Sequence, residues 1–89
     1  MVRKRVEFTG RVQGVGFRMR TLRIAAGFPV TGWVRNEDDG SVSMEVQGEQ
    51  QAVSAFCKAI EAEMGSLIRH SATADVAIVS GDGGFEIRA

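Results

Sequence analysis

The sequence predicts an α+β domain in which two helices cover one face of a mainly antiparallel sheet. Three observations lead to this prediction. Strand-like alternation and helix-like spacing follow one another in the order β-α-β-β-α-β, both helical segments carry an apolar stripe, and an Asp-Gly pair joins the two central strands. Both stripes are buried together only when the helices share one face, as in the ferredoxin-like sandwich. We expect residues 1–89 to form this one domain.

The first half of the chain supplies one strand, one helix and a second strand. Residues 3–9 alternate, with Val6 and Phe8 on the face expected to be buried. After a glycine-rich loop, residues 18–26 are predicted to be helical and to end at Gly27, with an inward face made of Met19, Leu22, Ala25 and Ala26. Residues 30–36 form the next predicted strand.

The second half begins at the turn Asp39-Gly40, where we expect positive φ at both central positions. Residues 41–47 then alternate most clearly, with Val42, Met44 and Val46 inward and Ser43, Glu45 and Gln47 outward. Gly48 is the predicted N-cap of a helix ending at Gly65, whose apolar stripe is Val53, Phe56, Cys57, Ile60 and Met64. Residues 76–79 and 85–88 are expected to be short terminal strands, the last of them additional to the basic fold.

Composition narrows the functional classes. The chain is 44% apolar and 25% charged, as in ordinary globular proteins. One cysteine excludes an internal disulfide, and no apolar run follows the charged N-terminus. We therefore expect a cytoplasmic protein without a membrane segment. Nothing in the sequence marks a subunit interface, so we expect a monomer.

Charge is unevenly divided along the chain. Residues 1–36 hold eight Lys or Arg and one acid, a net charge of +7, and residues 37–89 hold three bases and ten acids, a net charge of −7. One interpretation is a positive field that attracts an anionic ligand. The other is that both halves interleave in the fold and their charges face solvent. The sequence leaves both open.

The loop Gly10-Arg11-Val12-Gln13-Gly14-Val15-Gly16-Phe17-Arg18 is the strongest functional signal. Its glycines permit unusual dihedral angles, and Ser, Thr, Asp and Asn are absent from it, so no side chain caps the helix that follows. An uncapped helix N-terminus attracts anions. Because a cation is unfavourable at that position without an anion, Arg18 is predicted to bind one. The loop therefore predicts a phosphate or carboxylate site.

Several familiar sites are excluded. The glycine spacing does not fit G-x-G-x-x-G, and no G-K-[ST] follows, so neither nucleotide motif is present. The acidic run 36–40 departs from a calcium loop, because its glycine comes one position early and Gln47 stands where the final Glu is required. One histidine and one cysteine cannot form a zinc cluster. We expect neither metal nor cofactor.

Four ordered motifs together resemble the acylphosphatase family. They are V-Q-G-V-x-F-R at Val12 to Arg18, G-W-V-x-N at Gly32 to Asn36, D-G-x-V at Asp39 to Val42, and Q-G at Gln47-Gly48. The closing strand around Phe85 also matches, so the resemblance covers essentially the whole chain. Each motif is weak alone, and the ordered set is specific.

The resemblance implies hydrolysis of a carboxyl-phosphate anhydride, with a small acyl phosphate as substrate. In that family pattern Arg18 and the backbone N–H groups of Gln13, Gly14, Val15, Gly16 and Phe17 bind the phosphoryl group, while Asn36 orients the attacking water. The residue types suit this chemistry, because the carboxylate leaves without prior protonation and the loop offers no general acid. Positioning and charge stabilisation are sufficient, so no metal is implied.

Three departures and two alternatives accompany this interpretation. Gly16 stands at a position where the family often has a bulky residue, Pro29 lies where the family commonly has Gly-Leu, and residues 67–74 lack the family's Gly-Pro-rich turn.

A non-catalytic phosphate-binding or partner module would carry the same loop, although the lack of an extension favours an independent enzyme. RNA binding is the least favoured class, because residues 41–47 offer no aromatic for base stacking. Outside the site, we expect Cys57 and Trp33 to pack and His70 to be solvated.

Overall fold

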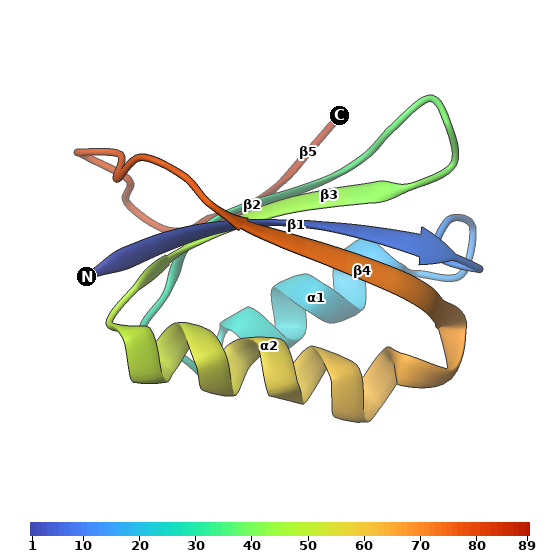
Figure 1. Cartoon of the computed structure of the whole chain (residues 1–89), viewed down its shortest axis with the longest axis horizontal. Helices are drawn as coiled ribbons and strands as arrows, with labels where there is room; N and C mark the ends of the chain where they lie inside the picture. Colours follow the sequence, from blue (N-terminus) through green and yellow to red (C-terminus); the bar gives the residue numbers. More distant parts are fainter.

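In the computed structural model, which describes residues 1–89, five strands form one sheet in the order β4-β1-β3-β2-β5, and both α-helices lie on the same face of it (Figure 1). The elements are β1 (Val2–Gly10), α1 (Phe17–Ala25), β2 (Thr31–Asn36), β3 (Val42–Gly48), α2 (Gln50–Met64), the 3₁₀ turn η1 (Gly65–Leu67), β4 (Ile68–Asp75) and β5 (Phe85–Arg88). This confirms the predicted ferredoxin-like α+β fold with an additional C-terminal strand.

The sheet topology brings two distant chain segments to one edge of the fold. β1 pairs antiparallel with β3 and β4, and β2 pairs antiparallel with β3. β5 instead runs parallel to β2, with Arg35 opposite Arg88. The carboxyl ends of β2 and β5 therefore lie side by side, and both lie close to the start of α1, since Asn36 and Ile87 line one cavity with Arg18.

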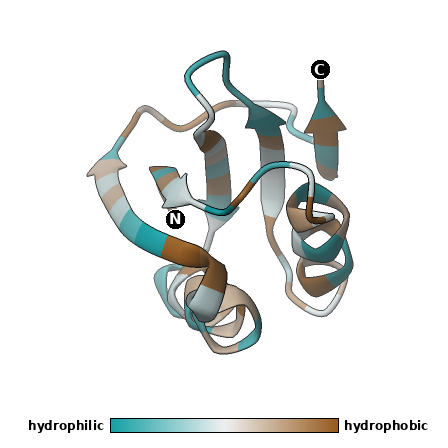
Figure 2. Cartoon of the chain, turned by 90° about the vertical axis from the view of Figure 1, so that its right-hand side faces the viewer, coloured by the Kyte–Doolittle hydropathy of each residue, from teal (hydrophilic) through white to brown (hydrophobic).

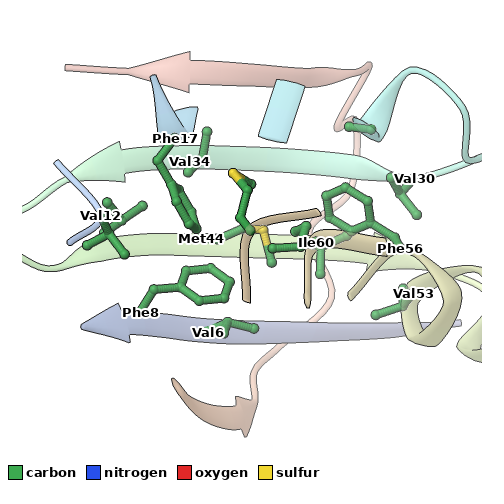
Figure 3. Packing of buried hydrophobic residues seen from close by; sticks show 14 residues of the cluster. Val6, Phe8, Val12, Phe17, Val30, Val34, Met44, Val53, Phe56 and Ile60 are labelled. Atoms are coloured by element: carbon green, nitrogen blue, oxygen red, sulfur yellow. The ribbon is translucent and has the colours of Figure 1, made fainter. Parts of the chain in front are cut away.

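The core lies between the sheet and the helices. The inward residues of β3 are fully buried, as predicted, and they belong to one cluster with the α2 stripe of Val53, Phe56, Ile60 and Met64 (Figure 3). Each such side chain contributes about 1.5–3 kcal/mol on burial. This cluster fixes the sheet on which the ends of β2 and β5 are carried.

The predicted inward face of α1 is correct only in part, since Ala25 is buried but Met19 and Ala26 are exposed. The buried residues are Phe17, Thr21 and Ala25, while Met19 is 58% exposed. The helix begins one residue earlier than expected, and Phe17 enters the core, which turns Met19 by about 200° to the opposite side. The buried Thr21 hydroxyl is satisfied within the helix, because it donates to the Phe17 carbonyl at 2.9 Å.

The predicted strand at 76–79 is also wrong, because the fourth strand is β4, at residues 68–75. It is an edge strand with exposed side chains, including that of His70, so it lacks the alternation that marks a half-buried strand. The apolar residues 76–79 instead cross toward β3. There the Val79 N–H donates to Gln47 Oε1 at 2.8 Å, and Gln47 Nε2 donates to the Val79 carbonyl at 2.9 Å.

Part of the face of β3 that was expected to be outward is covered. Ser43 and Gln47 are buried, so the outer side of β3 is largely covered. Trp33 packs on this face, as predicted, with the guanidinium carbons of Arg5, Arg35 and Arg88 between 4.9 and 5.4 Å from its ring centroid. Cation–π contacts of this kind cover the aromatic ring.

Smaller differences concern element ends. Only Gly40 has positive φ in the β2–β3 turn, and the Gly40 N–H donates to the Glu37 carbonyl, so the loop is a three-residue turn rather than the expected two-residue one. Glu49, and not Gly48, is the N-cap of α2. Neither helix is long and apolar enough to cross a membrane.

Candidate functional site

The loop between β1 and α1 is fixed to the core at both ends. Val12 and Phe17 are fully buried, and Val15 packs against the same cluster. The Phe17 ring lies against that of Phe8, with centroids 5.1 Å apart (Figure 3). Alternate residues of the loop therefore anchor it, and the glycines between them remain at the surface.

Gly14 and Gly16 give the loop its shape. Their φ angles are 74° and 78°, in the left-handed region that L-residues seldom adopt. A Cβ atom at either position would meet no heavy atom within 4 Å. Backbone conformation, rather than lack of space, therefore requires glycine at both positions.

The loop and the first turn of α1 leave their N–H groups free. Gly16 is the N-cap of α1 and makes no side-chain cap, and the first turn contains no acid, as the sequence predicted. No N–H group of residues 13–18 donates to an acceptor within the protein. Free N–H groups at the positive end of a helix dipole form an anion site.

Arg18 stands at this helix end without a carboxylate partner. Its Nη1 makes one long hydrogen bond, 3.4 Å, to the carbonyl oxygen of Arg88 at the end of β5. Arg20, two residues later, forms an ion pair with Glu63 at 3.7 Å. Arg18 therefore keeps most of its five donors for an anionic ligand.

Asn36 meets this loop from the end of β2. A cavity of about 300 Å³ is lined by Gly14, Gly16, Arg18 and Asn36, together with Val12, Phe17, Met19 and Ile87. Residues that are far apart in the sequence thus enclose one concave site, which unites both predicted catalytic residues with both glycines.

Two of the predicted substrate-binding residues do not line this cavity with their side chains. Val15 packs on the core. Gln13 points toward the β2–β3 turn, where its Nε2 donates to the carbonyls of Glu37 and Ser41, both at 2.8 Å. Figure 2 looks onto this end of the molecule, with the loop below the hydrophilic turn. Neither residue is among those that line the cavity, so the predicted binding through their main-chain N–H groups stays a prediction.

Two lining residues lie outside the predicted phosphate-binding loop 12–18 and were absent from the predicted site: Met19 and Ile87. Met19 was assigned to the core from helical spacing. Counting that spacing from Phe17 instead would have placed Met19 outside the buried face. Ile87 could not be found in this way, because only the parallel pairing of β5 with β2 brings it to the cavity.

The site is cationic and holds no titrating acid or base. Its lining contains no Asp, Glu, His or Cys. Among the nearby acids, the hydrogen bond from Arg35 lowers the pKa of Glu37, and that from Ser41 lowers the pKa of Asp39. No cluster of three metal-ligating side chains occurs in the structure. The site can bind an anion, stabilise charge and orient a small molecule.

Other hollows lack this combination. One of about 430 Å³ beside the N-terminus contains Lys4 and Asp75, which pair with each other. Another of about 540 Å³ lies on the outside of α2 and contains a single cation, Lys58. Neither brings an unpaired arginine to free N–H groups.

Comparison with known proteins identifies the family. The family model described as acylphosphatase matches residues 4–87. Relatives named acylphosphatase from Oceanobacillus iheyensis and Bifidobacterium longum are 53% identical over 57 residues and 44% identical over 80 residues. These segments cover 64% and 89% of this chain, and 63% and 82% of the relatives. The match to the Oceanobacillus relative thus spans less than two thirds of that protein's length.

Solved structures agree as well. The acylphosphatase from Bacillus subtilis superposes with a TM-score of 0.89 at 29% identity, over the full length of both chains. One from Coxiella burnetii shares the fold, with a TM-score of 0.84 at 22% identity over 98% of this chain and 92% of that chain. HypF from T. kodakarensis matches all of this chain with 12% of its own length, with a TM-score of 0.86 at 25% identity. The chain belongs to the acylphosphatase family.

Proposed function

We propose that this protein hydrolyses acyl phosphates to a carboxylate and inorganic phosphate. One observation carries the proposal: a single cavity combines the unpaired Arg18, the glycine loop with its free N–H groups, and Asn36. Family membership supports the same reaction.

The phosphoryl group is the part of the substrate that this cavity suits. The N–H groups of residues 13–18 and the guanidinium of Arg18 donate to its oxygens. As the transition state spreads negative charge over these oxygens, fixed donors stabilise it without reorganising. Removing one such donor typically reduces the rate by about 10²–10³.

Asn36 orients the water. Its neutral carboxamide accepts a hydrogen bond from water without repelling the phosphoryl oxygens, as a carboxylate would. The water oxygen attacks phosphorus, and the bond from phosphorus to the acyl oxygen breaks with its electron pair on the carboxylate. One water and an acyl phosphate dianion thus give RCOO⁻ and H₂PO₄⁻.

No general acid is needed for this reaction. Carboxylic acids have pKa values of about 4, so the carboxylate leaves unprotonated at neutral pH. The lining of the cavity matches this requirement, because it has no group that titrates near neutrality. We propose that the reaction is independent of metal, since Arg18 and the N–H groups supply the positive charge.

We also propose that the protein acts as a monomer on a small-molecule substrate without nucleic acid, since the residues assigned to phosphate binding and to the water, Arg18 and Asn36, lie on the same chain. The half-buried Cys57, a free thiol with a pKa raised by burial, is consistent with a cytoplasmic location.

The test is phosphate release from acetyl phosphate with EDTA present. We expect fast turnover by the wild type, almost none by Arg18→Ala, and full activity in Arg23→Ala, which removes an exposed arginine of the same helix. Circular dichroism checks that each variant is folded. An active, folded Arg18→Ala protein would exclude the proposal.

A second candidate is a phosphate-binding module without catalysis. The match to 12% of the T. kodakarensis HypF chain favours it, because there the same fold is part of a much larger protein. Titration with inorganic phosphate separates the two functions. Binding by a wild type that releases no phosphate from acetyl phosphate would support the module.

A further inference from the structure

The side chain of Gln13 bridges the loop and the turn on opposite sides of the site. Its Nε2 donates to the carbonyl oxygens of Glu37 and Ser41, each at 2.8 Å. These two residues also close the β2–β3 turn, since the Glu37 N–H donates to the Ser41 carbonyl at 2.9 Å. Asn36 directly precedes this closing pair. One amide nitrogen thus fixes the mouth of the turn to the loop.

We propose that Gln13 is a positioning residue that sets the place of Asn36 relative to the loop. The inference rests on the proposed function, in which Asn36 orients the water. Residues 38–40 at the tip of the turn are exposed, and Asn36 and Glu37 are only half-buried. The pairing of β2 with β3 holds the base of this turn. Among the side chains of the loop, only that of Gln13 forms hydrogen bonds with the turn.

The chemistry requires a neutral group with two N–H donors on one atom. Both partners are carbonyl oxygens, so each can only accept. A carboxylate in place of the amide has no proton to donate and repels both oxygens. A methionine keeps the length of the side chain and removes both hydrogen bonds. Gln13→Met is therefore the cleanest probe, and Gln13→Glu is the second variant.

The expected effect is on turnover rather than on phosphate binding. Misplacing a reacting group by about 1 Å can reduce a rate about 10²-fold. We expect Gln13→Met to lower kcat by about 10- to 10²-fold on the same basis. Inhibition by inorganic phosphate should change little, because the substitution leaves every main-chain N–H of the loop in place.

A double-mutant cycle with Asn36→Ala tests the inference. If Gln13 acts through Asn36, then Gln13→Met should lower kcat no further once Asn36 is already alanine. Gln51→Met is the matched control, since Gln51 is exposed on α2 outside the cavity, and its kcat should equal that of the wild type. Thermal unfolding confirms that every variant is folded.

Three outcomes would overturn the inference: an unchanged kcat in both Gln13 variants, a full additional loss in the Asn36→Ala background, or a loss of phosphate affinity that matches the loss of rate. Amide hydrogen exchange separates these from failure of the proposed function. The Gly40 N–H, which donates to the Glu37 carbonyl, should exchange faster in Gln13→Met. If the wild type does not hydrolyse acetyl phosphate but the Gly40 N–H still exchanges faster in Gln13→Met, the proposed function is wrong and the bridge from Gln13 to the turn is supported.

Discussion

On the face of the sheet away from the helices, Arg3 is 3% exposed and bonds to Glu45 and Asp82, at 2.7 and 2.8 Å. In the first turn of α1, Arg18 has no carboxylate partner and its side chain bonds only to the Arg88 carbonyl. The first arginine joins β1 to β3 and to the segment before β5, so it stabilises the fold. The second retains its donors for a ligand.

The ion pairs of the fold decide whether the uneven charge along the sequence produces a separate positive field or is interleaved in the structure. The ion pairs join the basic first half to the acidic second half, as in Lys4 with Asp75 and Arg20 with Glu63. The two halves therefore interleave rather than forming two separate fields. The case for an anion site at the loop therefore rests on the position of Arg18 beside free N–H groups, and not on the count of arginines.

The largest expected effect is on stability, from Arg3→Met. This change leaves two mostly buried carboxylates without their shared cation, which should destabilise the fold by about 3 kcal/mol. Arg18→Ala should change the free energy of unfolding by less than about 0.5 kcal/mol, because it breaks no ion pair. Urea unfolding of both variants measures the contrast, and equal losses of stability would remove the distinction between the two arginines.

Asn36→Ala should have the next largest effect. Loss of the water-orienting amide is expected to lower kcat by about 10²-fold, while inhibition by phosphate stays near the wild-type value. Asn36→Asp places a negative charge beside the anion and should weaken phosphate inhibition as well. Steady-state kinetics with acetyl phosphate gives both quantities. A loss of phosphate affinity in Asn36→Ala equal to the loss of rate would assign Asn36 to binding.

Where the sequence carries a strong local signal, prediction of the fold succeeded. The alternation of β3 and the stripe of α2 are periodic enough to identify both elements and their buried faces. β4 was missed because an exposed edge strand needs no apolar alternation; only its pairing with β1 defines it. Long-range pairing is a tertiary property that no short segment records.

Some features of the candidate site also have a local signal in the sequence, and others do not. Glycines before an uncapped helix indicated the anion loop, because dihedral freedom and free N–H groups are local properties. That Asn36 lies beside this loop followed only from the family resemblance, and the cavity now places them together. The outward turn of the Gln13 side chain had no local signal, since its two acceptors are main-chain carbonyls that every residue possesses.

Acid should weaken the Arg3 region. Burial alone would raise the pKa of Glu45, but hydrogen bonds from Arg3 and Arg5 outweigh it and hold that pKa below its ordinary value. The unfolded chain therefore binds this proton more readily than the folded one. The stabilisation is complete above the ordinary pKa of about 4.3 and is lost as the pH falls through the lower folded pKa.

Chemical unfolding of wild type and Glu45→Gln between pH 7 and pH 2 measures this linkage. We expect the variant to be less stable at neutral pH, with the difference shrinking as the medium becomes acidic. Parallel curves for the two proteins would show that Glu45 does not carry the effect.

The smallest expected effect concerns Met19, the exposed apolar side chain at the mouth of the cavity. Met19 and Ile87 both line this cavity, so under the proposed function they would form an apolar wall beside the acyl group of the substrate. Covering about 40 Å² of apolar surface is worth about 1 kcal/mol, or about a fivefold change in kcat/KM. Met19→Ser should lose this factor with benzoyl phosphate and little with acetyl phosphate, whereas Met19→Leu should retain it. Equal losses with both substrates would mean that Met19 acts on the helix terminus and Arg18, and not on the acyl group.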